Sequence, residues 1–358
     1  MTAALTADVA IVGGGIIGLA SAERLTAHGA RVIVIDDTAA AGGATGVSGG
    51  LVRAFDPSGT HTAWAAESSI RYRSRGWHGS WPAVRRHGSL TLIDRRELAA
   101  LTPHIEAVRD AGLEIDVLDA GDIERRHPQL TVPDHLLAVA EPQAGWLPAA
   151  DVALALRRDA GAGLHLHHTR ALGLKHSSSR VRGVHTSGGD VHADAVLLAA
   201  GTGSTDLAAS VGVRLPLRTR AVSYCLFHSD DIAGLPTTVD RTTGAWLRRW
   251  ENGHAVLAGV ASARADVPAR IRDGVGRAEE DRIRTVVAER FPHLAHAPAV
   301  GGVTAYDAMT ATGGPGTVTS WPDPHGLVTA VGWNGGGFKL APAIGRQAAD
   351  HLMEALKR

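Results

Sequence analysis

One lysine stands where a plain surface charge would be out of place. The sequence contains 36 lysines and arginines together, yet only three are lysines, at positions 175, 339 and 357. Lys339 follows a glycine turn in the segment GWNGGGFKL (332–340), between two apolar neighbours. An ammonium group in an apolar, glycine-lined setting is costly unless an anion pairs with it. The chemistry expected of Lys339 is therefore the binding of an anion such as a carboxylate.

Two other patterns could carry chemistry, as a nucleophile or as a metal site. The segment GVSGG (46–50) has the spacing of a hydrolase nucleophile elbow, which needs a strand before the serine and a helix after it. A loop precedes this serine, so we favour a loop whose hydroxyl and amide groups contact a phosphate. His165 and His167 would share one face of a strand, but no acid or cysteine stands at ligand spacing. We interpret the histidine-rich stretch 165–176 as a solvated strand edge.

The elements that would position these groups begin with a complete dinucleotide-binding pattern. A short apolar strand is predicted at 9–12, and the glycine turn GxGxxG follows at 13–18. A helix is predicted at 16–27 and a second strand at 31–35, which ends on an acid. Strand, glycine turn, helix, strand and acid thus occur in the order that dinucleotide binding requires.

Each part of this pattern has a physical role. Gly13 permits the tight turn, Gly15 lets the backbone approach a pyrophosphate, and Gly18 lets the helix pack closely on the strand. The helix N-terminus presents free N–H groups and the positive end of its dipole to the phosphates. Asp36, at the end of the second strand, can accept hydrogen bonds from ribose hydroxyls.

The motif alone does not separate NAD from FAD, but three later segments do. The loop 39–53 is rich in glycine and hydroxyl groups, and 193–204 is a buried strand that closes on two glycines. The segment 326–352 has the pattern of strand, glycine turn and helix. Together these segments resemble the D-amino-acid-oxidase-type flavoprotein family, especially its glycine oxidase and sarcosine oxidase branch. The resemblance spans nearly the whole chain and includes GSLTLID (88–94) and EPQAGWLPAADVALAL (141–156).

The resemblance implies an α/β fold with two parts. A Rossmann-like domain would bind FAD in an extended form, and a second, mostly antiparallel sheet would cover the flavin. The FAD-binding domain would be discontinuous, comprising residues 1–85, 144–214 and 320–358, and the substrate domain would comprise 86–143 and 215–319. An NAD-dependent enzyme is disfavoured because the C-terminal glycine turn would then have no purpose, and nothing in the sequence supports a non-catalytic flavoprotein.

The expected cofactor contacts lie in the first motif, the following loop, the strand end near 201 and the C-terminal glycine turn. They are Gly13, Gly15, Ile16, Ile17, Gly18, Asp36, Asp37, Thr45, Ser48, Gly49, Gly201, Gly335, Gly336, Gly337 and Phe338. Some sarcosine oxidases tether their flavin to a cysteine in the segment that corresponds to GGVTAYDAMT (301–310). Thr304 stands at that place and the segment contains no cysteine, so we expect FAD to be bound non-covalently.

The resemblance also implies an activity, the oxidation of the Cα–N bond of glycine or an N-substituted glycine. The imine would hydrolyse to glyoxylate and an amine, and O₂ would become H₂O₂. In the sarcosine oxidase branch a lysine after the last glycine turn binds the substrate carboxylate, which gives that role to Lys339. Arg53, in the segment LVRAFD, is the expected second cation.

Two departures from the family keep alternatives open. The glycine oxidases carry a carboxylate-binding arginine in the segment 301–310, which has no arginine here. The segment 256–267 also lacks the lysine that sarcosine oxidases are thought to use for reaction with O₂. A dehydrogenase that uses another electron acceptor, or a sarcosine, proline or D-amino-acid oxidase, is therefore the alternative.

The expected substrate is bulkier than sarcosine. The sarcosine oxidase branch typically has histidine where this chain has Gly336, and the strands of the substrate domain offer Tyr224, Trp246 and Met309 as apolar walls. Burial of an alkyl chain contributes about 0.8 kcal/mol per methylene. A carboxymethyl amine with a large N-substituent, such as a β-amino acid used in secondary metabolism, fits this pattern.

Composition excludes several classes of partner. The formal net charge is zero, which favours neither nucleic acid nor an acidic membrane surface. The single cysteine, Cys225, leaves no internal disulfide and fits a reducing cytoplasm. The N-terminal segment has no basic region before its short apolar run, so we expect no signal peptide or membrane span.

Overall fold

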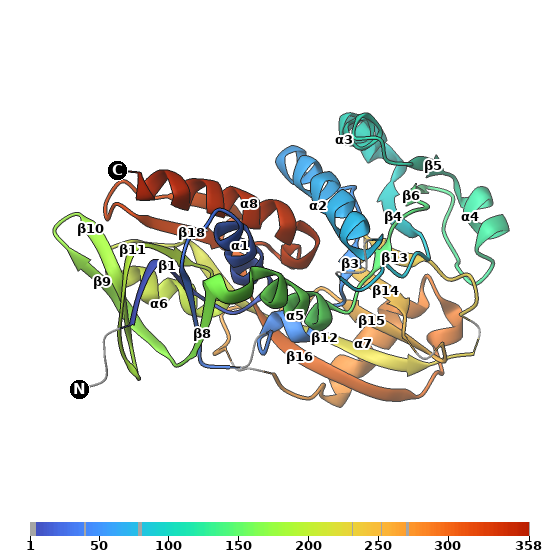
Figure 1. Ribbon diagram of the computed structural model, residues 1–358. Coiled ribbons are helices and arrows are strands. Elements are labelled where there is room, and N and C mark those ends of the chain that lie inside the picture. The colour runs from blue at the N-terminus through green and yellow to red at the C-terminus, as the bar shows by residue number, and fades with distance from the viewer. Residues whose placement is uncertain are drawn as a thin grey trace.

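The computed structural model describes residues 5–38, 41–77, 81–230, 232–251, 253–269 and 272–357. These residues form two eight-stranded sheets, a two-stranded ribbon and the helices that cover them (Figure 1). Two residues of the expected phosphate loop, Ala39 and Ala40, lie outside the described residues.

The first sheet contains the dinucleotide-binding pattern, in the strand order β17-β18-β11-β1-β2-β8, with β10 beside β11 and β9 beside β10. Its strands are β1 (Leu5–Val12), β2 (Val32–Asp36), β8 (Leu164–His168), β9 (Ala171–Ser177), β10 (Arg180–Thr186), β11 (Gly189–Leu198), β17 (Thr317–Ser320) and β18 (Leu327–Val331). The central pairs β11–β1, β1–β2, β2–β8 and β11–β18 are parallel. Strands β2 and β18 and the C-terminal halves of β1 and β11 are apolar because helices or other strands cover both faces of the sheet there.

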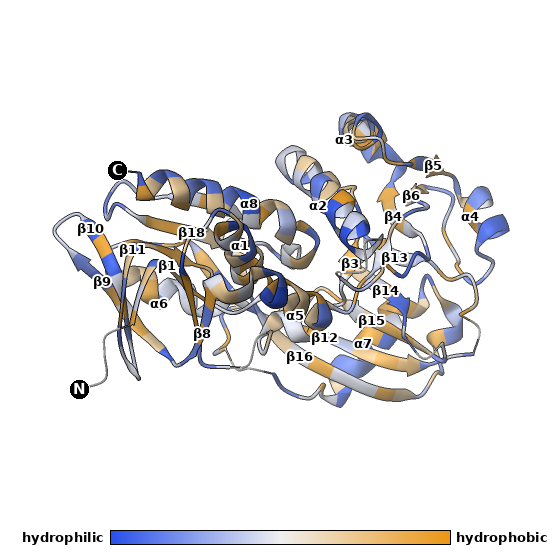
Figure 2. Cartoon of the chain, viewed as in Figure 1, coloured by the Kyte–Doolittle hydropathy of each residue, from blue (hydrophilic) through white to orange (hydrophobic). Residues whose placement is uncertain are grey.

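Helices α1 (Ile16–Ala27), α5 (Ala149–Ala160) and α8 (Gly337–Leu356) share one apolar cluster with one face of this sheet. Helix α6 (Ser204–Ala209) and strands β9 and β10 share another with the opposite face. In Figure 2 the strands of the sheet are largely apolar, whereas α8 alternates between hydrophilic and hydrophobic residues along its length. This arrangement places the N-termini of α1 and α8 at the carboxyl ends of β1 and β18, where open α/β sheets bind their ligands.

The second sheet has the order β16-β12-β15-β14-β13-β4-β6-β5 and is antiparallel except for the pair β13–β4. Its strands are β4 (Ser89–Asp94), β5 (Asp116–Leu118), β6 (Leu136–Glu141), β12 (Leu217–His228), β13 (Thr237–Asp240), β14 (Ala245–Arg249), β15 (Ala255–Val260) and β16 (Ala299–Thr310). Helix α7 (Arg277–Ala288) packs on one face, in a cluster that includes Cys225 and Leu247. Side chains alternate along a strand, so Tyr224, Trp246 and Arg248 lie on the other face.

The remaining elements connect and flank the two sheets. They are α2 (Gly59–Trp77), α3 (Leu98–Asp110), α4 (Ala120–Arg126), the short ribbon strands β3 (Leu51–Val52) and β7 (Gly145–Trp146), and the 3₁₀ turns η1 (Ala44–Val47), η2 (Arg95–Glu97), η3 (Gly161–Gly163), η4 (Gly201–Gly203) and η5 (Pro292–Leu294). Strands β3 and β7 pair antiparallel, so residues 51–52 and 145–146 lie side by side.

The expected α/β fold with a second, mostly antiparallel sheet is confirmed. The helix expected at 16–27 is α1, and the strand–turn–helix expected at the C-terminus is β18 followed by α8. Strands of the first sheet come from 5–36, 164–198 and 317–331, and those of the second from 89–141 and 217–310. Only β17 begins before the boundary expected at 320. The division of the chain into two domains at these boundaries stays a prediction.

The nucleophile elbow is absent from the segment 41–50. These residues form turns and the 3₁₀ turn η1, and Ser48 is followed by the short strand β3 instead of a helix. Ser48 Oγ accepts a hydrogen bond from the amide of Gly50, at 3.2 Å. This serine lies in a loop, and its expected contact with a phosphate stays a prediction.

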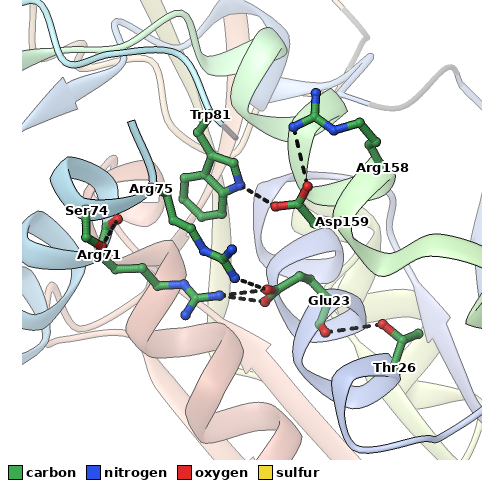
Figure 3. A network of polar contacts seen from close by, with 8 residues as sticks. All are labelled: Glu23, Thr26, Arg71, Ser74, Arg75, Trp81, Arg158 and Asp159. Carbon is green, nitrogen blue, oxygen red and sulfur yellow. Dashed lines mark hydrogen bonds and ion pairs between the residues drawn. The ribbon is translucent and has the colours of Figure 1, made fainter. Parts of the chain in front are cut away.

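A buried ion-pair network ties α1 to α2 and lies beside α5 (Figure 3). Glu23 of α1, only 5% exposed, accepts two hydrogen bonds from Arg71 at 2.8 Å and one from Arg75 at 3.0 Å. Both guanidinium groups lie over the ring of Trp81, 5.7 and 5.9 Å from its centroid. The indole in turn donates to Asp159 of α5 at 2.8 Å. The network therefore holds α1, which begins at the glycine turn, against α2 and beside α5.

Removing the shared acid should loosen this layer of helices. Glu23→Leu leaves two arginines without their carboxylate, and we expect the free energy of unfolding to fall by roughly 3 kcal/mol, at the low end for a broken buried pair because Arg75 is partly exposed. Arg158→Met is the control, since that side chain is 63% exposed and its ion pair lies at the surface. Chemical denaturation of both variants measures the difference. Equal stability of the two variants would contradict a structural role for Glu23.

Candidate active site

The turn after β1 forms a cradle that only glycines can line. Gly13 has φ +114°, and a Cβ added to it would lie 2.3 Å from the carbonyl oxygen of Ala199. A Cβ on Gly18 would lie 1.9 Å from the carbonyl oxygen of Gly13. Gly15 caps the N-terminus of α1, and the hydroxyl of Thr45 accepts a hydrogen bond from the amide of Ile16 at 3.0 Å. The α1 N-terminus and the η1 loop are thus in contact, as a pyrophosphate site requires.

Asp36 lies at the end of β2, where a ribose would be held. Its Oδ2 accepts a hydrogen bond from the amide of Gly14 at 2.6 Å, and its Oδ1 accepts one from the amide of Thr38 at 2.8 Å. These contacts hold the carboxylate beside the glycine turn. Asp37 instead forms an ion pair with Arg170 at 3.0 Å on the surface, so the two neighbouring acids have different surroundings.

The C-terminal glycine turn forms the second cradle, at the start of α8. Gly335 has φ +82° and no atom within 4 Å of an added Cβ, and the same is true of Gly201, with φ +55°. The carbonyl of Phe338 accepts a hydrogen bond from the hydroxyl of buried Tyr72 at 2.6 Å. The open position at Gly335 and the N-terminus of α8 fit a flavin at this turn, and Gly201 offers another open position on η4. These residues, together with Gly336 and Gly337, would hold the ring system of FAD.

Lys339 is buried, 6% exposed, and its ammonium pairs with the carboxylate of Asp56. Glu141, 4% exposed, accepts hydrogen bonds from the amides of Ala54 at 2.6 Å and Phe55 at 3.2 Å. The anion that Lys339 requires is therefore supplied by the protein. The sequence alone does not indicate Asp56 as this partner.

We call Arg53, Asp56, Glu141 and Lys339 the balanced cluster, because it contains two cations and two acids. Burial and, to a smaller extent, the charge of Arg53 lower the pKa of Lys339 to about 8, although Asp56 opposes both effects. Burial alone would raise the pKa of Asp56, but Lys339 holds it below its usual value. Arg53 donates to the carbonyl of Phe55 at 2.6 Å. The roles of Arg53 and Lys339 toward a substrate stay predictions.

The face of the second sheet opposite α7 carries an aromatic wall. Tyr224 and Trp246 are in edge-to-face contact, with their ring centroids 6.0 Å apart. The indole of Trp246 would meet a Cβ on Gly49 at 3.0 Å and one on Gly259 at 2.8 Å, so two glycines make room for it. The wall therefore lies against the loop that follows η1. Met309 lies on β16, and its register opposite Arg218 places it on the same face as Tyr224.

Gly336 does not sit in open space. A Cβ there would lie 3.2 Å from the carbonyl oxygen of Trp333 and 3.7 Å from Leu340. The room expected from the absence of a side chain at this position is therefore limited by the turn itself, and a substrate pocket at Gly336 stays a prediction.

Sequence reasoning missed several buried charged groups near these elements. They are Asp56, Glu141, Asp307 and Arg248. Burial raises the pKa of Asp307, which accepts a hydrogen bond from the amide of Gly335 at 2.9 Å. Arg248 could have been found, since it is two residues after Trp246 in a predicted strand and must share its face.

The single cysteine of the chain lies away from the glycine cradles. Cys225 is buried in the α7 cluster, and burial raises the pKa of its thiol to about 11. Thr304 is also buried, and its hydroxyl is 2.8 Å from that of Ser223.

We therefore predict that the flavin has no link to a cysteine. Precipitation of the purified protein with acid should leave the yellow colour in the supernatant, because nothing covalent retains the cofactor. Colour that stays in the washed pellet would contradict the prediction.

Comparison with known proteins defines the class to which this site belongs. A family model described as FAD dependent oxidoreductase matches residues 8–351. The chain belongs to this family of FAD-dependent oxidoreductases, with FAD as its cofactor, and is an enzyme of the group that oxidises amines and amino acids. The glycine cradles described above are consistent with that cofactor.

Two curated relatives and one solved structure illustrate what the chain is similar to. Glycine oxidase of Geobacillus kaustophilus is 27% identical over 355 residues, covering 96% of this chain and 92% of that protein. Monomeric sarcosine oxidase of Bacillus sp. (strain B-0618) is 24% identical over 229 residues, which span 63% of this chain and 58% of that protein. The structure of L-proline dehydrogenase from P. horikoshii superposes with a TM-score of 0.87 at 18% identity, over 98% of this chain and 94% of that chain. That likeness shows a shared fold.

The described part of the chain contains neither a cluster of metal-ligating side chains nor a helix that could span a membrane. His165 and His167 stack on β8 with ring centroids 6.2 Å apart, but within the described ranges no group of three or more metal-ligating side chains could hold an ion. Among the same residues no helix is both long and apolar enough to cross a membrane.

Proposed function

We propose that the chain oxidises the Cα–N bond of an N-substituted glycine whose N-substituent is larger than methyl. A hydride equivalent leaves the carbon next to nitrogen, and water then adds to the imine to give glyoxylate and the free amine. FAD, when bound, supplies the two-electron acceptor for this step. The contribution of the chain's own residues is to bind and orient the amine and to exclude water.

The observation that carries the proposal is the aromatic wall beside the cofactor loop. Trp246 contacts the position of Gly49, which follows η1, and Tyr224 extends the wall along the second sheet. Rings of this size offer a surface for an alkyl or aryl group attached to the reacting nitrogen. Glycine or sarcosine would leave this surface without a partner.

A second candidate is a dehydrogenase that passes its electrons to an acceptor other than O₂. The observation in its favour is the placement of the lysines. Lys175 pairs with Asp190 near the surface, Lys339 pairs with Asp56, and Lys357 lies at the C-terminal end of α8. No other lysine exists in the sequence to promote reaction with O₂. Comparing turnover with O₂ and with an artificial dye acceptor separates the two candidates.

The preferred chain length tests the proposal. We expect kcat/KM to rise from sarcosine through N-ethylglycine and N-butylglycine to N-hexylglycine, because each methylene buried on the wall adds about 0.8 kcal/mol, or nearly fourfold. Trp246→Ala should flatten the series while sarcosine turnover changes little. A series that falls from sarcosine onward would show that the enzyme prefers small amines.

A further inference from the structure

We propose that Arg248 is the anchor for the substrate's carboxylate, in an anion site built on β14 and β7. The inference rests on the proposed function and names the residue that would give it selectivity for acids. Arg248 is a buried cation that, within the described part of the chain, has no carboxylate in ion-pair contact.

The buried charged side chains of this structure are few, and most have a partner of opposite charge. Glu23 pairs with Arg71 and Arg75, and Asp240 pairs with Arg290 at 2.9 Å. In each of these pairs a buried charge lies next to a group of opposite charge. Lys339 is paired within the balanced cluster, and Glu141 accepts from two backbone amides.

Arg248 is only 3% exposed and differs from all of these. Its Nε donates to the carbonyl of Gly49 at 2.7 Å, and its Nη1 donates to the carbonyl of Arg249 at 2.8 Å. Both acceptors are neutral, so the positive charge is not compensated. Burial lowers the pKa of Arg248 to about 10, and the exposed acid Glu251 opposes this effect. The guanidinium is therefore still charged at neutral pH.

The surroundings hold the guanidinium plane in one orientation. The guanidinium carbon lies 3.8 Å from the ring centroid of Trp146 and 5.0 Å from that of Trp250. Stacking on aromatic faces fixes the plane of the fork, which suits binding of a carboxylate through two parallel hydrogen bonds. Among the described residues the buried indole N–H of Trp146 also has no hydrogen-bond partner. A buried cation and an unused donor at one place are the signature of an anion that the protein itself does not provide.

The site lies beside the cofactor loop and the aromatic wall. Arg248 and Trp246 are two residues apart on β14 and share one face, and both contact Gly49, one through its carbonyl and the other through its Cα side. A substrate whose N-substituent rests on Trp246 is therefore within reach of Arg248. At the balanced cluster, by contrast, the carboxylate of a substrate would face the two acids already there, Asp56 and Glu141. The charge balance thus favours Arg248 as the anchor.

The test separates anion binding from a structural role of Arg248 on the Gly49 loop. The probe is (butylthio)acetate, in which sulfur replaces the amine nitrogen so that no oxidation can follow, and its neutral amide. Binding to the FAD-loaded protein is read from the perturbation of the flavin absorption spectrum. The variants are Arg248→Met, Arg248→Lys and the control Arg249→Met, which removes the neighbouring arginine from the opposite face of the same strand.

Wild-type protein should bind the acid at least about 30-fold more tightly than the amide, the smallest effect expected from losing one partner of a buried charge pair. Arg248→Met should bring both dissociation constants to a similar value, and Arg248→Lys should keep part of the preference because it keeps the charge without the fork. Arg249→Met should behave like wild type. An unchanged preference in Arg248→Met would overturn the inference. So would wild-type protein that binds acid and amide equally, whether or not the variants retain FAD.

The outcome is distinguishable from failure of the proposed function. If the acid preference depends on Arg248 but no N-substituted glycine is oxidised, the anion site stands and the reaction assigned to it is wrong. If N-substituted glycines are oxidised and Lys339→Met, instead of Arg248→Met, abolishes the acid preference, the reaction stands and the anchor is wrong.

Discussion

Lys339→Met should lower the free energy of unfolding by roughly 3–5 kcal/mol, because it leaves the carboxylate of Asp56 buried without its cation. Asp56 and Lys339 are 283 positions apart in sequence, and their pair links the segment after β3 to the first turn of α8. The double variant Asp56→Leu/Lys339→Met should recover most of this loss, since an apolar pair of similar volume carries no desolvation cost. Denaturant unfolding of the four proteins in this double-mutant cycle measures the coupling. Additive losses would contradict the pair.

The burial of Lys339 gives stability a defined dependence on pH. The pKa of Lys339 is lowered from 10.5 to about 8 in the folded protein. Between these values the unfolded chain keeps the proton and the folded chain releases it, so the free energy of unfolding rises with pH across that window. Lys339→Met should remove this rise. Denaturation midpoints at pH 8 and pH 10, in wild type and variant, give the comparison, and an identical pH slope in both would contradict the assignment.

Gly18→Ala should strip the protein of its cofactor. An added Cβ would lie 1.9 Å from the backbone oxygen of Gly13, and neither atom belongs to a side chain that can rotate away. Overpacking of this kind costs about 1–3 kcal/mol, which corresponds to roughly tenfold or more in FAD affinity if the turn shifts to relieve it. The FAD content of purified protein and its retention on dilution measure the effect.

Gly203→Ala is the matched control for this experiment. It lies on η4 near the other end of the cradle, its backbone is helical, and an added Cβ would meet only the side chain of Ala200 at 3.9 Å. It should keep its FAD. A yellow Gly18→Ala protein with full occupancy would contradict the placement of the pyrophosphate at the first glycine turn.

The parts of the fold that local sequence determines were predictable. Helix α1 begins at the glycine turn and ends at Ala27, as the sequence predicts, because the turn and the helix together bury the β1–α1–β2 unit. The strand around Trp246 and the helix after the C-terminal glycines follow from the same kind of local pattern. Cys225 lies buried on β12.

The charge partners were not predictable, because they come from segments far apart in sequence. The apolar, glycine-lined setting of Lys339 indicates that its ammonium needs an anion. Spacing along the chain does not identify Asp56 as that anion. Glu141 comes to the same place only because β6 ends beside the segment after β3. Arg248 is a different case, since alternation in the strand GAWLRRW places it beside Trp246. What the sequence could not show is that this arginine has no carboxylate in ion-pair contact among the residues that the structure describes.

Anaerobic reduction of the bound flavin by N-butylglycine tests whether the enzyme oxidises N-substituted glycines. In the absence of O₂ the measurement is independent of which acceptor reoxidises the enzyme. We expect loss of the visible flavin absorption in a single turnover, with one glyoxylate and one butylamine released per FAD. Reduction should be faster than with sarcosine. Flavin that stays oxidised with every N-substituted glycine, but is reduced by proline or by a D-amino acid, would contradict the proposed function.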